Sequence, residues 1–185
     1  MKKYMSFGLA MLFAALFVTV AQAEVVSGKS YYTRVNIWYQ VPERIFSTNY
    51  HVGSILPAGS LIKAVKVGKD YILFSDEKGI TYKITYMAQH STGTMASFLA
   101  ATFSEENILA GEEYKKLSEM EKGNISKGII AEGMSKPAVL MAYGYPPSHR
   151  TQSTDMNAWT YWENRFVTKL VTFSPDSGLV TQISR

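Results

Sequence analysis

The sequence predicts an α+β protein of two units: an N-terminal half forming a small β-barrel or rolled sheet, and a C-terminal half in which helices precede three antiparallel strands. The first observation behind this prediction is composition, because 46% hydrophobic and 13% aromatic residues are typical of globular chains. The second is length, since 185 residues suffice for one ordinary domain or two small ones. The third is a change of hydrophobic period along the chain, from the two of strands to about the 3.6 of helices.

Residues 1–23 have the pattern of a secretory signal peptide. Two lysines precede an apolar run of 14 residues, which is followed by the small-x-small sequence of residues 21–23. That run is shorter than the roughly 20 residues that span a bilayer, so a cleaved signal is favoured over a transmembrane anchor. Cleavage after Ala23 would leave residues 24–185 as a soluble periplasmic or secreted protein with no transmembrane segment.

Charge and cysteine content exclude several classes of function. The formal charge of +4 includes Lys2 and Lys3, so the mature chain has too small a basic surplus to indicate nucleic-acid binding. The chain has no cysteine, which excludes disulfides, thiolate metal sites, iron–sulfur clusters, a cysteine nucleophile and a lipidated cysteine. An exported chain without cysteine is more typical of a bacterial envelope than of an animal secretory route.

The first half, residues 24–90, alternates apolar and polar residues between turn sequences. This pattern predicts five short strands, at residues 31–38, 45–50, 60–67, 71–74 and 80–86. The turns contain glycine, proline or aspartate and lie at residues 56–59, 68–70 and 76–79. Because a flat sheet of such strands would leave both edges open, a rolled or closed sheet is favoured. A linker is expected at residues 88–93.

The second half, residues 94–185, begins with helical spacing. A helix is expected after Thr94, because four residues share one face: Met95, Phe98, Leu99 and Thr102. A second helix is expected from Ser104, whose two following glutamates suit a positive helix end, to a stop at Gly123.

A third, short helix is expected between Ser135, which is a capping residue, and Gly144, which suits a helix exit. Pro137 is acceptable in its first turn. Alternation then predicts three antiparallel strands, at residues 159–162, 166–173 and 179–183.

Residues 133–146, GMSKPAVLMAYGYP, resemble a motif of the SmpA/OmlA (BamE-like) family: a Gly-Met-Ser start, a short helix and a Gly-x-Pro exit. An aromatic strand with Trp159 and Tyr161 follows, and then a hairpin whose turn contains Asp176 and Gly178. The resemblance covers residues 104–185. It implies two helices packed on a three-stranded antiparallel sheet, and a protein-binding module without catalysis in outer-membrane assembly or maintenance. Secreted protein inhibitors of β-lactamase share this small fold.

Two features depart from that family. The lipidated cysteine is missing, and a β-rich half precedes the family-like region. In this added half, residues 56–60 and the β-branched strand after them are similar to bacterial Src-homology-3-like barrels of the envelope.

The residue types that commonly carry catalysis or bind metals do not form a recognisable motif in this sequence. The three histidines, His51, His90 and His149, lack the spacing that places two imidazoles on one metal, and His51 and His149 are interpreted as surface or turn residues. Neither a Gly-x-Ser-x-Gly elbow nor a phosphate-binding glycine loop is present. The sequence therefore predicts a protein that is not an enzyme, with no catalytic, cofactor-binding or metal-binding residues.

Aromatic residues are the remaining functional signal, since a ring buries a large area at low entropic cost in an interface. Strand alternation places Trp159 and Tyr161 on the core face and Trp162 on the other. The candidate partner-binding residues are Trp162, Tyr145, Arg150, Arg165, Trp38 and Tyr39. Three hypotheses follow: a protein-interaction module of the envelope, a peptidoglycan binder that uses first-half tyrosines, and a secreted inhibitor of an enzyme.

Overall fold

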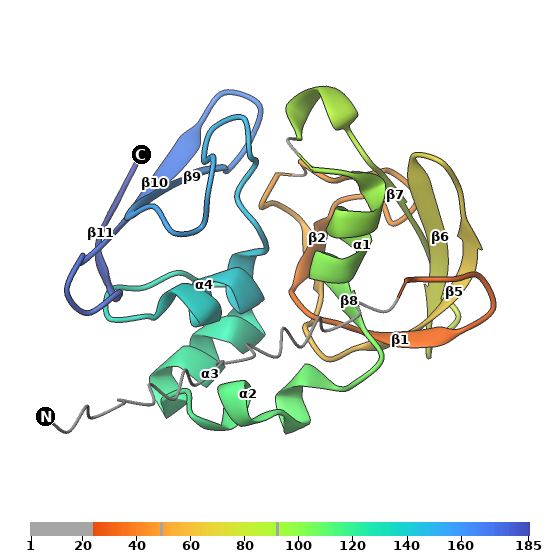
Figure 1. Cartoon of the computed structure of the whole chain (residues 1–185), viewed down its shortest axis with the longest axis horizontal. Helices are drawn as coiled ribbons and strands as arrows, with labels where there is room; N and C mark the ends of the chain where they lie inside the picture. The colour runs from red at the N-terminus through yellow and green to blue at the C-terminus, as the bar shows by residue number, and fades with distance from the viewer. Residues whose placement is uncertain (1–23, 49, 92) are drawn as a thin grey trace, which may run out of the picture.

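The structure is a computed structural model that describes residues 24–48, 50–91 and 93–185. It is an α+β protein in which a β-rich half and a mixed half lie side by side (Figure 1). The expected signal peptide, residues 1–23, lies outside the described residues. Within the described part of the chain, no helix has the length and apolar character needed to cross a membrane.

The first half is built on a six-stranded sheet that curls as a half-barrel (Figure 1). Its strands, in spatial order, are β3 (Ile45–Phe46), β7 (Thr81–Thr85), β6 (Tyr71–Asp76), β5 (Leu61–Val67), β1 (Ser30–Thr33) and β8 (Phe103–Ser104). Neighbours are antiparallel except β3 and β7, which are parallel. Strands β3 and β8 are the two edges, so the sheet is rolled without closing.

Helix α1 (Met95–Thr102) begins where the sequence predicts. Thr94 caps it through a reciprocal pair of hydrogen bonds with Ser97. Leu99 and Phe103 are buried in one core with residues of the sheet, chiefly Tyr31, Ile62, Ile72, Phe74, Tyr82 and Ile84. Thus α1 and β8 belong to the first core, whereas the sequence assigned them to the second domain. Helical periodicity shows that a face is apolar but does not specify the sheet that covers it.

The first expected strand, residues 31–38, is instead two strands. Between β1 and β2 (Ile37–Tyr39) the main chain turns to other elements: the amide of Arg34 donates to Thr102 and that of Asn36 donates to Met141. Strand β2 pairs with β4 (Ser54–Leu56), which the sequence did not predict, to form a separate two-stranded ribbon. The expected strand at 45–50 is reduced to the two residues of β3.

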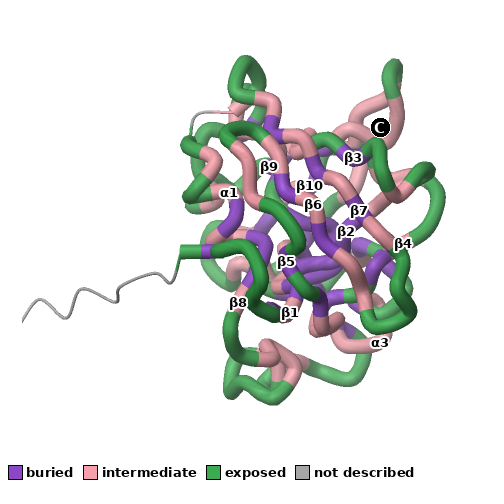
Figure 2. Tube along the Cα trace, turned by 90° about the vertical axis from the view of Figure 1, so that its right-hand side faces the viewer, coloured by how far each residue is buried: buried purple, intermediate pink, exposed green. Residues whose placement is uncertain are grey.

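The second half packs helices on a three-stranded antiparallel sheet, as predicted. The strands are β9 (Ala158–Trp162), β10 (Thr168–Phe173) and β11 (Val180–Ser184), in the order β11-β10-β9. Its core includes the buried side chains of Met134, Val139, Trp159, Tyr161, Val171 and Phe173. Figure 2 shows the buried residues gathered in the interior of the molecule.

The expected helix from Ser104 to Gly123 is wrong. Residue 104 ends β8, and the chain then forms a 3-10 helix η2 (Ile108–Ala110), α2 (Glu112–Lys115) and α3 (Glu119–Lys127). Extended backbone at Gly111 interrupts the pattern, and Ser118 starts a new helix by forming a capping box with Glu121. Since Ser-x-x-Glu is a start signal, this boundary was visible in the sequence.

Helix α4 (Lys136–Tyr143) matches its prediction. Ser135 is its N-cap residue, a proline lies in its first turn, and Gly144 ends it with a φ of 79°. The Ser135 hydroxyl does not cap α4, however, and donates instead to the Glu121 carboxylate at 2.7 Å. The short helix is therefore fixed to the start of α3.

Candidate binding cleft between the two halves

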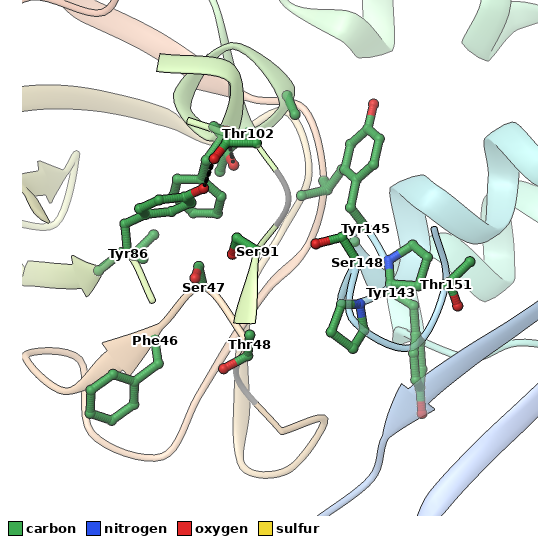
Figure 3. Close-up of a pocket in the computed structure, with 18 of the residues that line it drawn as sticks. Phe46, Ser47, Thr48, Tyr86, Ser91, Thr102, Tyr143, Tyr145, Ser148 and Thr151 are labelled. Atoms are coloured by element: carbon green, nitrogen blue, oxygen red, sulfur yellow. Dashed lines mark hydrogen bonds between the residues drawn. The ribbon is translucent and has the colours of Figure 1, made fainter. Parts of the chain in front are cut away.

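A cleft of about 330 Å³ lies between the halves. Figure 3 shows Phe46, Ser47 and Tyr86 of the first half on one side, and Tyr145 and Ser148 of the second half on the other. The second-half wall is the segment that follows α4, where Gly144 ends the helix and two prolines follow. The predicted helix exit thus positions one wall of the cleft.

The cleft is lined by rings and hydroxyl groups. Among the described residues that line it, there is no aspartate, glutamate, lysine or arginine. The serines and threonines around it are Ser47, Thr48, Ser91, Thr94, Ser97, Thr102, Ser148, Thr151, Ser153 and Thr154. Apolar walls with neutral polar groups are typical of sites for uncharged ligands.

Three of the predicted partner-binding residues line this cleft, namely Trp38, Tyr145 and Trp162, and Tyr145 is 48% exposed. The Arg150 guanidinium lies 5.4 Å from the Trp162 ring, within the range of a cation–π contact. Arg165 is exposed in the β9–β10 turn beside Phe166 and does not line the cleft.

The two first-half candidates have different positions. Trp38 is partly buried and packs against the second core, and its ring lies 5.7 Å from that of Tyr143. Tyr39 packs against the first core, with its ring 5.3 Å from that of Tyr82, and does not line the cleft. Both residues are partly buried, so neither is an exposed anchor for a partner protein.

Asn36 links the halves and was missed by the sequence analysis. Its buried side-chain amide donates to the carbonyls of Ile125 at 2.7 Å and Ala142 at 3.0 Å. Its side-chain oxygen accepts from the amide of Ala58 at 2.8 Å. A single asparagine inside one predicted strand, residues 31–38, gives no pattern from which this role could be predicted.

His51, in the connection between β3 and β4, also reaches across. Its Nδ1 lies 3.0 Å from the carbonyl oxygen of Trp162, and its Nε2 lies 2.6 Å from that of Tyr143. The ring stacks on Tyr143 with 3.9 Å between centroids. Burial lowers the pKa of His51 to about 4, although both carbonyl contacts raise it. The interpretation of His51 as a simple turn residue is therefore incomplete.

We call Asn36, Trp38 and His51 together the junction. At the rim of the cleft a second contact joins the halves, since the rings of His90 and His149 lie 5.2 Å apart. Within the described part of the chain, no group of three or more potential ligands is placed to hold a metal ion.

Comparison of the chain with family models, with curated proteins and with solved structures gives no match. The resemblance of residues 104–185 to the SmpA/OmlA family remains a prediction, and function is argued from the cleft.

Proposed function

We propose that this chain is an exported, non-catalytic protein-interaction module of the bacterial envelope, and that its cleft holds an uncharged, extended segment of a partner protein. The observation that carries the proposal is the lining of the cleft, with rings and hydroxyls and no charged side chain among the described residues. A charged occupant would lose hydration against this lining, which offers no ionic partner, and Arg150 contacts Trp162 from outside the lining.

The edge of the first sheet favours an extended occupant. Strand β3 is an edge strand, and four consecutive residues, 45–48, line the cleft. The amide of Ser47 donates to Thr85 of β7 at 2.9 Å. Because main-chain groups alternate in direction along a strand, those of Phe46 face the opposite, open side of β3. An added strand from a partner would pair with such an edge.

The first-half tyrosines argue against the peptidoglycan alternative. Tyr31 and Tyr82 are each 1% exposed and belong to the first core, so these two rings do not form a stacking platform. The third hypothesis, a secreted enzyme inhibitor, is a special case of a protein-interaction module. In that case the protein captured in the experiment below would be the inhibited enzyme.

The histidines support a non-catalytic function. Both ring nitrogens of His51 face main-chain carbonyl oxygens, so neither is aimed at a hydroxyl nucleophile. His149 also places its Nδ1 near a carbonyl oxygen, that of His90, at 3.2 Å.

Affinity capture from bacterial envelope extracts tests the proposal. Wild type should retain a protein partner, and the double variant Phe46→Ala/Tyr145→Ala should lose it because the rings on both walls are removed. Thr48→Lys should lose it as well, by introducing a charge into the neutral lining. The matched control is Phe166→Ala, which removes an 84% exposed ring outside the cleft.

Two results would contradict the proposal. One is a partner lost equally in the Phe166→Ala control, which would place the contact on another surface. The other is cosedimentation with peptidoglycan sacculi that survives the cleft variants, with no protein captured.

A further inference from the structure

The two halves are joined by one passage of the chain and by side-chain and main-chain contacts. The first core ends with Phe103, and the fully buried residues of the second core begin at Ile125. Among the described residues, contacts between the halves include the junction, the main-chain hydrogen bonds from Asn36 to Met141 and from His51 to Trp162, and the histidine pair at the rim.

His51 is the titratable member of the junction. A neutral imidazole has one N–H, whereas both of its nitrogens face carbonyl oxygens, so one contact lacks a proton in the neutral form. A protonated ring would supply both hydrogen bonds but would bring a charge into a desolvated contact. The balance between these effects decides whether acid tightens or loosens the junction.

The charged and titratable groups around His51 offer no free carboxylate. Tyr143 stacks on the ring and Tyr161 lies edge-on at 5.3 Å. Lys169 donates to the Tyr143 hydroxyl at 2.7 Å and pairs with Glu163 at 3.0 Å. Glu163 is also held by Arg185, whose Nε lies 2.8 Å away. Since two cations already neutralise Glu163, a charged His51 would face a net positive surrounding.

We infer that His51 is a proton-sensitive latch: acidification detaches it from the two main-chain carbonyls of the second half and opens the cleft. Opening needs no bound partner and stands independently of the proposed function. If the cleft binds a partner, as proposed above, opening of the latch would also release that partner on acidification.

The expected size follows from proton linkage. A free imidazole has a pKa of about 6.5, and burial lowers the pKa of His51 to about 4 in the closed form. The open form therefore takes up the proton first, and closure loses stability as the pH falls from 6.5 towards 4. Between about pH 7.5 and about pH 5, the ratio of open to closed molecules should rise about 30-fold.

Distance measurements between two spin labels test the latch. The chain has no cysteine, so labels at Glu77→Cys and Asp176→Cys, one exposed position in each half, attach without background. Longer distances should appear at about pH 5 and be absent at about pH 7.5. Far- and near-ultraviolet circular dichroism of the same samples should remain native.

Two histidine variants assign the effect. His51→Gln retains an uncharged donor but does not titrate, so the response to pH should be lost. The double variant His90→Gln/His149→Gln leaves His51 as the only one of the three histidines, and most of the opening should remain.

The inference is overturned by equal distances at both pH values, by opening that survives His51→Gln, or by opening accompanied by loss of native circular dichroism. A closed state that becomes more populated in acid would equally overturn it, because the carbonyl contacts would then outweigh desolvation. The labels report opening without a partner, so failure of the capture experiment would leave this result unaffected.

Discussion

The two halves contribute different chemistry to the contact between them. The first half supplies the side chains of Asn36, Trp38 and His51 and two main-chain amides, while the second half supplies main-chain carbonyls and ring faces. Main-chain acceptors are present whatever side chain a residue carries, whereas an amide or imidazole is present only in particular residue types. Substitutions in the junction should therefore be costly in the first half and tolerated more readily at the facing positions of the second.

The largest expected effect is that of Asn36→Ala. It leaves two carbonyls of the second half and one amide of the first without their partner, so the free energy of unfolding should fall by about 3 kcal/mol or more. Urea denaturation measures this loss. The control Asn157→Ala removes an exposed amide whose contact is with Lys136, and should change stability by less than about 0.5 kcal/mol. Equal losses in the two variants would contradict the role of Asn36.

Gly144→Val tests the second half at the exit of α4. Gly144 has a φ of 79° and a ψ of −175°, which a β-branched residue adopts only with strain, so we expect a loss of about 2 kcal/mol. Thermal unfolding measures it. The matched substitution Gly123→Ala, inside α3 with no atom near the added Cβ, should instead stabilise by up to about 1 kcal/mol. An unchanged melting temperature for Gly144→Val would contradict the backbone argument.

Glu121→Gln tests the internal polar contact of the second half. The carboxylate accepts hydrogen bonds from the amides and hydroxyls of Ser118 and Ser135, which joins the starts of α3 and α4. Burial alone would raise the pKa of Glu121, but these hydrogen bonds outweigh it and lower the pKa. A neutral amide should cost about 1 to 2 kcal/mol near neutral pH.

The pH dependence of this loss follows from the sign of the shift. A lowered pKa in the folded state adds stability above the ordinary value of 4.5, and that stability is lost as the pH falls below it. Urea titrations of wild type and Glu121→Gln should therefore converge in acid. A difference that persists undiminished there would show that packing, and not charge, causes the loss.

The sequence predicted local structure better than contacts between distant segments. Helix α4 is specified within eight residues by a cap, a proline and a glycine, and each strand of the second sheet is specified by its own alternation. The helix expected from Ser104 does not form because two local signals, Gly111 and the Ser118 capping box, interrupt the helical periodicity. Even there, the information was local.

The junction could not be predicted in the same way. Asn36 contacts residues 89 and 106 positions away, and His51 contacts residues 92 and 111 positions away. Their partners are main-chain carbonyls, which leave no signature in the sequence. Strand alternation did predict that Trp162 turns away from Trp159 and Tyr161, which lie in the core, and the Trp162 ring lines the cleft.

The smallest expected effect on stability separates two tryptophans that lie on opposite sides of the contact. Trp162 joins the junction through its carbonyl oxygen, which any residue at that position provides, and its partly buried ring lies in the cleft lining. Trp162→Ala should therefore cost about 1 kcal/mol or less while weakening capture of the partner. Trp38 contributes its ring, so Trp38→Ala should cost about 2 to 3 kcal/mol, less than a fully buried tryptophan. Parallel thermal unfolding and capture experiments compare the variants. If Trp162→Ala is the more destabilising of the two, the second half also contributes side chains that stabilise the contact. The proposed difference between the halves would then be wrong.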